Sequence, residues 1–257
     1  MTALLACRGL TVDRGGRRLV EAFDFALRAG EIAAVIGPNG VGKSSLLATL
    51  AGLLPATSGV IELEGRGLAA LSRREVAQRL GFLPQDTEDP YPATVLETAL
   101  IGRHPHIGFW RWESAADAAK ARAALRRVGL AAAANRPVAT LSGGERRRLA
   151  IATLLTQAPR VHLLDEPLEA LDLGYQARLL RLFRRLARAT GTAALMSLHD
   201  LSLAGRYADR VILLDGRGGT ETGPPGRVLE PARLGAIYGC RIRRIEVPGE
   251  PPLFRAD

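Results

Sequence analysis

The chain lacks several features that would place it in particular protein classes. It has only two cysteines, Cys7 and Cys240, whose spacing fits no metal site, so we expect both to be buried or inert thiols. No apolar run approaches the ~18 residues that a membrane-spanning helix needs. The N-terminus has no basic residue ahead of its short apolar stretch, unlike a signal peptide. These absences predict a cytoplasmic protein, and the 257 residues suffice for one large domain with a substantial core.

Lysine is nearly absent from this basic chain. Arginine supplies all but two of the 35 basic side chains, and the net charge is +9. That charge favours acidic partners such as a nucleotide, a nucleic acid or a membrane surface, although basic residues spread along a chain are also typical of a solvated surface. One lysine is Lys120, and the other, Lys43, lies in the glycine-rich segment VIGPNGVGKSSLL. The position of Lys43 therefore indicates a specific role.

Apolar patterns predict strands that alternate with helices. Continuous apolar runs occur at 32–36 and 81–84 and within 160–167, 193–200 and 211–216, as in buried parallel strands. Alternation at 19–27 and in VIELEG indicates further strands, and helical spacing appears at 114–128 and 179–187. The order predicts an α/β fold with a mostly parallel sheet, a helical lobe from about 86 to 142 and a small tail after 216.

The segment GPNGVGKS fits the pattern G-x-x-x-x-G-K-[ST] between a predicted strand and a predicted helix. Glycines allow the backbone to curl around an anion, and the helix start adds the positive end of its dipole. Lys43 can reach the phosphates as a compact charge, and Ser44 can bind Mg²⁺. We therefore predict a phosphate-binding loop rather than a simple glycine-rich turn.

Two further motifs carry polar groups to the ends of predicted elements. In VHLLDE, Asp165 can hold Mg²⁺ and Glu166 can act as general base toward the attacking water. In LSGGERRRLAIA, Ser142 and Glu145 form a capping box at a helix start, which is either a helix cap alone or a second anion site. Of Arg146, Arg147 and Arg148, we expect at least two on a solvated helix face.

The order of GPNGVGKS, FLPQ, LSGGE, LLDEP and SLHD resembles the ATP-binding cassette (ABC) ATPases, and the resemblance covers about residues 4–238. It implies an α/β fold: a P-loop NTPase core with a mostly parallel sheet, an antiparallel β-subdomain and an inserted helical subdomain. We assign 1–85 and 143–215 to the nucleotide-binding core, 86–142 to the helical subdomain and 216–257 to a small C-terminal extension of one ABC ATPase domain.

The resemblance also implies roles for single residues, with ATP and Mg²⁺ as cofactors. Two chains would pair head to tail, so that each ATP lies between the loop of one chain and the LSGGE segment of the other. Catalysis would involve Lys43, Gln85, Glu166 and His199, with Ser44, Gln85 and Asp165 at Mg²⁺ and Asp172 communicating across the dimer. The residues implied in ATP binding are Gly37, Pro38, Asn39, Gly40, Val41, Gly42, Lys43, Ser44, Ser45 and Arg14 together with Ser142, Gly143, Gly144 and Glu145.

Two positions depart from the family pattern. Arg14 stands where an aromatic residue usually stacks on adenine, although a guanidinium plane can also stack on a base. Leu168 and Glu169 stand where the family usually has Thr-Ser after Glu-Pro, and a carboxylate at Glu169 would weaken the contact across the dimer or repel phosphate.

LIGRHPHIGFW, LDLGYQ and HDLSLAGRYADRVILLDG are similar to importers of cobalamin, ferric siderophores and haem. The subfamily implies a permease of transmembrane subunits fed by a periplasmic substrate-binding protein, with the ATPase on the cytoplasmic face of the bacterial inner membrane. RHPH and FWRWE favour cobalamin slightly over ferric siderophore, with haem third. His104 and His106 lie in a loop expected to face the permease, and Phe109, Trp110 and Trp112 are partner-facing or lobe core.

Two alternatives compete with an importer ATPase. The +9 charge suggests a soluble ABC-type ATPase acting on nucleic acid, but such proteins usually carry two cassettes or a coiled coil, and this chain has neither. A non-catalytic scaffold or assembly factor conflicts with the intact set Lys43, Asp165, Glu166 and His199. We therefore expect no nucleic-acid partner.

Overall fold

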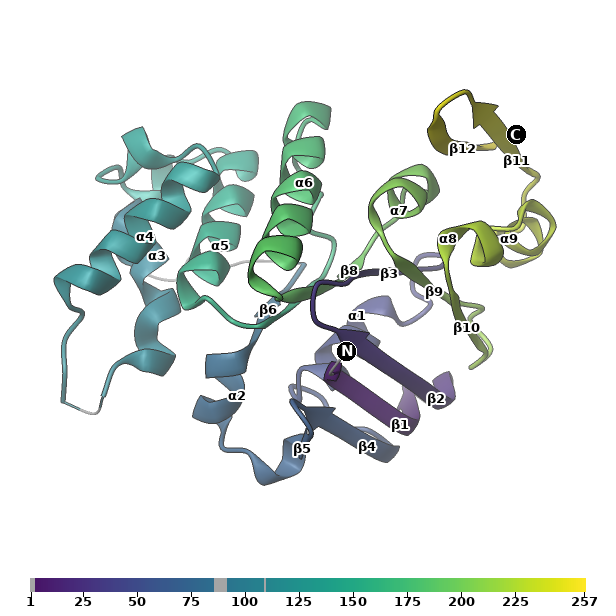
Figure 1. The fold of residues 1–257 in the computed structure, drawn as a ribbon, viewed down its shortest axis with the longest axis horizontal. Helices are drawn as coiled ribbons and strands as arrows, with labels where there is room; N and C mark the ends of the chain where they lie inside the picture. The colour runs from purple at the N-terminus through teal and green to yellow at the C-terminus, as the bar shows by residue number, and fades with distance from the viewer. Residues whose placement is uncertain (1–2, 86–91, 109) are drawn as a thin grey trace.

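The protein is described here from a computed structural model that covers residues 3–85, 92–108 and 110–257 (Figure 1). A six-stranded sheet in the order β10-β9-β3-β8-β7-β6 forms its centre. All pairs are parallel except β9 with β10, which confirms the predicted mostly parallel sheet. The strands are β3 (Ile32–Ile36), β6 (Leu80–Leu83), β7 (Val161–Leu164), β8 (Ala193–Ser197), β9 (Arg210–Leu214) and β10 (Thr220–Gly223).

Beside this sheet lies an antiparallel sheet in the order β2-β1-β4-β5. Its strands are β1 (Ala3–Arg14), β2 (Arg17–Arg28), β4 (Ser58–Leu63) and β5 (Arg66–Gly67). Phe23 and Phe25 stack at 5.8 Å between ring centroids and join Val35 of the central sheet and Leu46 of α1 (Lys43–Leu50) in one core cluster. The sequence patterns predicted β2 and β4, but not β1.

Helices cover the opposite face of the central sheet (Figure 1). Ile32, Ala34 and Ile36 of β3 belong to the helix-covered core, whereas Ala33 and Val35 face the antiparallel sheet. This alternation follows from the two-residue period of a strand and explains why β3 is apolar throughout. The helices of this layer are α5 (Gly143–Gln157), α6 (Leu173–Thr190) and α7 (Leu201–Tyr207).

The lobe that contains α3 (Val95–Leu100) and α4 (Ala115–Arg127) lies at one end of the molecule (Figure 1). Both helices pack against α5, and an ion pair of 2.8 Å joins the buried Arg103 to the half-buried Asp117 of α4. Short 3-10 turns occupy Leu68–Ala70, Ile101–His106, Ala131–Ala133 and Val138–Thr140, and α2 (Arg73–Arg79) precedes β6. No helix in the described ranges is both long and apolar enough to span a bilayer.

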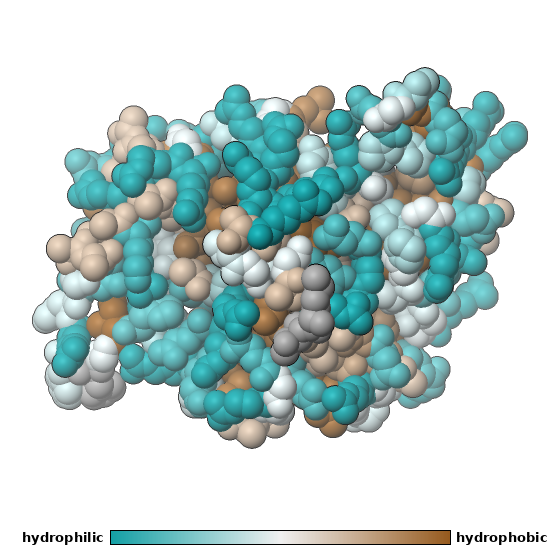
Figure 2. Space-filling model, viewed as in Figure 1, coloured by the Kyte–Doolittle hydropathy of each residue, from teal (hydrophilic) through white to brown (hydrophobic). Residues whose placement is uncertain are grey.

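The chain after 216 forms more than the small tail expected from its glycine and proline content. It contains β10, α8 (Pro225–Val228), α9 (Pro231–Tyr238) and a hairpin of β11 (Ile242–Val247) and β12 (Glu250–Ala256). The hairpin packs on α7, where the Phe254 N–H donates to Ser202 Oγ at 2.9 Å. On the face shown in Figure 2, hydrophilic side chains cover most of the surface.

Candidate active site

The loop between β3 and α1 can be built only with glycine at key positions. Gly37, Gly40 and Gly42 have φ values of 148°, 71° and 111°, which L side chains rarely adopt. A Cβ on Gly37 would lie 2.8 Å from the Leu214 carbonyl oxygen, and one on Gly42 would lie 3.0 Å from Leu19. The loop therefore curls directly into the start of α1, the geometry that presents backbone N–H groups to an anion.

Lys43 holds its charge inside this loop. The side chain is buried, and Nζ donates to the carbonyl oxygens of Gly37 at 2.9 Å and Pro38 at 3.0 Å. Burial lowers the pKa of Lys43, and the nearby carboxylates of Glu166 and Asp165 oppose that shift. The ammonium group is thus preorganised over the loop, where a bound phosphate would replace main-chain carbonyls as its partner.

Asp165 lies directly after β7 and is buried next to β8. Ser197 Oγ donates to Asp165 Oδ1 at 2.7 Å and accepts from the Glu166 N–H at 2.7 Å. One hydroxyl therefore fixes both the carboxylate of Asp165 and the backbone of Glu166.

Glu166 is the centre of a polar cluster contributed by three separate segments. Its Oε1 lies 2.7 Å from His199 Nε2, and its Oε2 accepts from Gln85 Nε2 at 3.1 Å. Gln85 Nε2 also lies 3.4 Å from Oε2 of Glu169. Parallel strands end at the same edge of the sheet, so segments after β6, β7 and β8 converge here.

These groups share one pocket of about 720 Å³. It is lined on one side by the glycine loop and on the other by Gln85, Glu166, Glu169 and His199. Ten of the predicted site residues line it: Arg14, Asn39, Gly40, Gly42, Lys43, Ser44, Ser45, Gln85, Glu166 and His199. A polar pocket at the carboxyl ends of parallel strands is where an α/β sheet binds its ligand.

Arg14 enters this pocket from the end of β1. Its Nη2 donates to the Pro55 carbonyl oxygen at 3.0 Å, and its Nη1 lies 3.4 Å from the Asp13 carbonyl oxygen. These bonds anchor the guanidinium at the rim of the pocket.

The remaining predicted site residues do not line the pocket. Within the loop, Gly37 and Val41 are buried and Pro38 is half-buried, and Asp165 is buried as well, whereas Ser142, Gly143, Gly144, Glu145 and Asp172 lie on other segments. Ser142 and Glu145 form the predicted capping box of α5, in which the Ser142 N–H donates to Glu145 at 2.9 Å and lowers the pKa of that carboxylate. Asp172 caps α6 by accepting from the Tyr175 N–H at 2.9 Å. Ser142, Gly143 and Asp172 are exposed, so a second chain can reach them.

The oxygen donors of the pocket, together with the buried Asp165 that precedes Glu166, fit Mg²⁺ held jointly with phosphate. The described residues contain no group of three His, Cys, Asp or Glu side chains that would hold a metal unaided. Ser44, Gln85 and Asp165 instead supply a hydroxyl, an amide and one carboxylate, a hard and incomplete donor set that phosphate oxygens complete.

The structure adds two residues that sequence reasoning missed at this site, Ser197 and Arg147, and it places Glu169, already noted as a departure from the family pattern, beside Gln85. Ser197 is the one polar residue in the apolar run of β8, which is a signal that the sequence offered. Arg147 is buried, whereas Arg146 is exposed and Arg148 is half-buried beside Tyr175. The expectation that at least two of these arginines are solvated thus holds fully only for Arg146.

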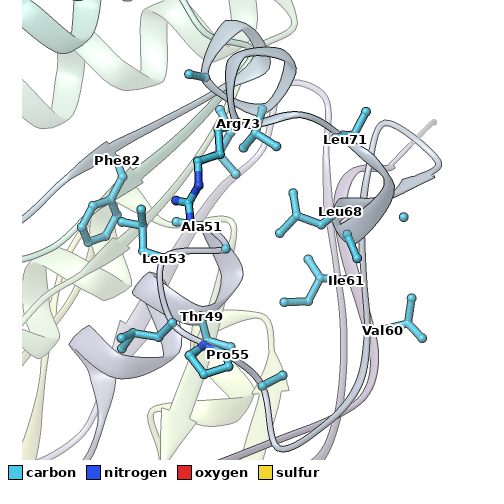
Figure 3. Close-up of a pocket in the computed structure, with 18 of the residues that line it drawn as sticks. Thr49, Ala51, Leu53, Pro55, Val60, Ile61, Leu68, Leu71, Arg73 and Phe82 are labelled. Carbon is cyan, nitrogen blue, oxygen red and sulfur yellow. The ribbon is translucent and has the colours of Figure 1, made fainter.

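A second pocket, of about 650 Å³, is mostly apolar (Figure 3). Leu68, Leu71 and Ile61 line one side in this view, Phe82 and Leu53 line the other, and Arg73 lies between them. Leu53 and Val60 are more than half exposed. The pocket contains no part of the glycine loop, so its chemistry differs from that of the polar pocket.

The structure describes four of the five aromatic and histidine residues that the sequence analysis singled out in the helical lobe. Trp110 and Trp112 are about 90% exposed, so neither belongs to the lobe core, and Phe109 lies outside the described residues. His106 Nε2 lies 2.8 Å from the Gln157 carbonyl oxygen, and His104 lies 3.7 Å from Glu113. His104 therefore makes a contact within the lobe, whereas His106 contacts the end of α5.

A glycine loop between a parallel strand and a helix, with Asp165 and Glu166 directly after β7 of the same sheet, defines a P-loop ATPase. Comparison with protein families narrows this class, because the ABC transporter model matches residues 20–169. The chain belongs to the ABC transporter ATP-binding family, and it is an ATPase that uses ATP and Mg²⁺.

Individual relatives and solved structures agree with this family. The chain is 42% identical to the hemin import ATP-binding protein of Myxococcus xanthus, over 96% of this chain and 94% of that one. It is 39% identical to the cobalamin import ATP-binding protein of Halobacterium salinarum, over 91% of this chain and 58% of that one. A solved metal-chelate type ABC transporter in an inward-facing conformation matches with a TM-score of 0.87 at 28% identity, over 100% and 98% of the two chains.

Proposed function

We propose that this chain is the ATP-hydrolysing subunit of an importer for a metal-chelate nutrient. The observation that carries the proposal is the pocket in which the glycine loop faces Gln85, Glu166 and His199. Relatives named for hemin, cobalamin and achromobactin transport support the importer class. The residues 1–85 and 143–215 act as the nucleotide-binding core, 86–142 as the helical subdomain and 216–257 as an extension.

Each residue of the pocket has a role that its position supports. Lys43 and the loop N–H groups hold the phosphates, while Ser44, Gln85 and Asp165 hold Mg²⁺. Glu166 accepts a proton from the attacking water. The 2.7 Å contact with Glu166 orients His199, which contacts the γ-phosphate once ATP is bound.

Catalysis needs a second copy of the chain in this proposal. The exposed N-terminus of α5, with Ser142, Gly143, Gly144 and Glu145, closes the partner's pocket in a head-to-tail homodimer. Two facing anion sites clamp the triphosphate, and ATP favours the closed pair because it interacts with both chains there. Asp172, which caps α6 on the exposed side, lies at the dimer contact.

The apolar pocket in Figure 3 is the place where we propose that the transmembrane permease docks. An exposed apolar surface that includes Leu53 and Val60 is costly in water and marks an interaction site. The exposed Trp110 and Trp112 extend this contact on the helical lobe. Through the permease the ATPase serves a periplasmic substrate-binding protein, which places it on the cytoplasmic face of the bacterial inner membrane.

The transported compound belongs to the class of hemin, cobalamin and siderophore complexes. Several relatives with the higher identities carry hemin in their names, whereas the sequence segments around His104 favoured cobalamin slightly. The substrate never enters the ATPase in this proposal, so the permease and its binding protein determine the choice.

Purification from native membranes tests the proposal. Tagged chain should recover a multi-helix permease, and Leu53→Asp should lose it because a charge enters the apolar pocket. Leu253→Asp, at a partly exposed leucine of β12, is the matched control that keeps the permease. Recovery of RNA or soluble proteins alone would instead favour a soluble ABC-type ATPase, and uptake of hemin, cobalamin and siderophore complexes by the recovered system would identify the substrate.

A further inference from the structure

Arg147 is a buried arginine in the second turn of α5. Only 5% of the residue is exposed, although arginine is rarely buried without strong hydrogen bonds. Its Nη1 donates to the carbonyl oxygens of Pro84 at 2.7 Å and Gln85 at 2.9 Å. Its Nη2 donates to the carbonyl oxygens of Asp165 and Glu166, the latter at 2.7 Å.

These four carbonyls belong to the two segments that carry the catalytic side chains. Pro84 and Gln85 follow β6, and Asp165 and Glu166 follow β7. The planar, forked guanidinium donates to both segments at once, a geometry that the single ammonium group of lysine does not reproduce. Arg147 thus fixes the spacing between the backbones that present Gln85 and Glu166.

The backbone of Glu166 needs such support. Its φ is 45°, a left-handed conformation that is costly for a residue other than glycine and persists only where neighbours enforce it. Its N–H donates to Ser197 Oγ, and its carbonyl oxygen accepts from Arg147. The peptide groups on both sides of the strained residue are therefore held by buried side chains.

Arg147 also lies close to the proposed dimer surface. It follows Ser142, the N-cap of the same helix, by five residues, about 7.5 Å along the axis at 1.5 Å per residue. We propose that Arg147 is a positioning residue that sets the pose of Glu166 and Gln85 and relays to them the engagement of Ser142 and Gly143 with the partner's ATP. This inference rests on the proposed function, because it takes Glu166 as the general base.

Kinetics of the purified chain test this role. Arg147→Gln should lower kcat about tenfold or more, since the loss of charge-assisted hydrogen bonds misplaces the base. KM and the affinity for a fluorescent ATP analogue should stay within about threefold, because the glycine loop is untouched. Arg147→Lys should recover part of kcat, and Arg185→Gln, at an exposed arginine of α6, should match the parent.

A double substitution separates positioning from a general loss of structure. If Arg147 acts through Glu166, adding Arg147→Gln to Glu166→Gln should lower the residual hydrolysis by less than about twofold. A further tenfold loss, or an unchanged kcat in Arg147→Gln alone, would overturn the inference. Full activity in Glu166→Gln alone would instead remove the general base of the proposed function, so the two failures are distinguishable.

Discussion

At the scale of single residues, the two lysines offer a matched pair. Lys43→Ala should weaken ATP binding more than about tenfold, because the loop loses its charge-assisted contact with the phosphates. Lys120→Ala removes the same charge from the exposed face of α4 and should leave affinity unchanged. Titration with a fluorescent ATP analogue measures both variants. Equal affinities would show that the glycine loop does not depend on its lysine.

Glu169 places an extra negative charge in the polar pocket. Its side chain lines the pocket and shares Gln85 with Glu166, where the family usually has a neutral residue. We expect Glu169→Gln to raise ATP affinity about threefold at low salt, with a smaller gain at high salt, since screening weakens repulsion at an exposed site. Glu246→Gln, on the exposed β11, controls for net charge. Weaker binding in Glu169→Gln would mean that the carboxylate helps to hold the nucleotide.

The site residues that could be predicted are those that lie together in short sequence motifs. Gly37–Ser45, Asp165 and Glu166 can be recognised from their fixed spacing next to apolar strands, and most of the loop residues line the pocket together with Glu166. Arg147 could not be distinguished from Arg146 by pattern, because its burial depends on carbonyls 18 to 63 residues away. A residue role that depends only on tertiary contacts cannot be predicted from a sequence motif.

At the scale of elements, β7 carries a buried histidine that makes stability depend on pH. His162 packs 5.3 Å from the Phe183 ring, and burial lowers its pKa to about 4. In the unfolded chain, His162 binds a proton near its ordinary pKa of 6.5, whereas in the folded chain its ring stays neutral down to about pH 4. The folded state therefore has its full stability above pH 6.5 and loses stability as the pH falls from 6.5 toward 4. The loss amounts to at most about 3 kcal/mol.

Urea denaturation at pH 7.5 and pH 5 measures this effect. The free energy of unfolding should fall with pH in the parent and fall less in His162→Gln, which keeps a hydrogen-bonding group but does not titrate. His104→Gln, at an exposed histidine, should retain the parent's pH dependence. An unchanged slope in His162→Gln would show that other groups govern acid sensitivity.

The strands that were predicted best are those buried on both faces, because their sequences are continuous apolar runs. Ile32–Ile36 is such a run, and its strand bounds agree with the pattern. β1 was missed because its burial pattern is interrupted at Arg8 and Gly9, beside a break in its pairing with β2. The C-terminal hairpin was missed because most of its residues are exposed. Its strands therefore lack the alternation of apolar and polar residues that predicts a strand.

At the scale of the whole molecule, the proposed dimer builds each site from two parts that do not meet within one chain. The glycine loop lines the polar pocket, whereas Gly143 is exposed at the start of α5 and does not. In a head-to-tail dimer, a chain with a damaged loop can still complete its partner's site. Gly143→Asp damages only the α5 half, since a side chain at Gly143 meets open space and an acidic group suits a helix start.

Mixed dimers therefore give the sharpest test of shared sites. In a Glu166→Gln background, which should trap ATP, neither Lys43→Ala nor Gly143→Asp should retain labelled ATP through gel filtration. An equal mixture of the two variants should retain about a quarter of the nucleotide that the Glu166→Gln protein retains. Half of the randomly formed dimers contain one chain of each variant, and each such dimer has one intact site out of two. Retention by Gly143→Asp alone would place the whole site within one chain, and no retention by the mixture would exclude the head-to-tail arrangement.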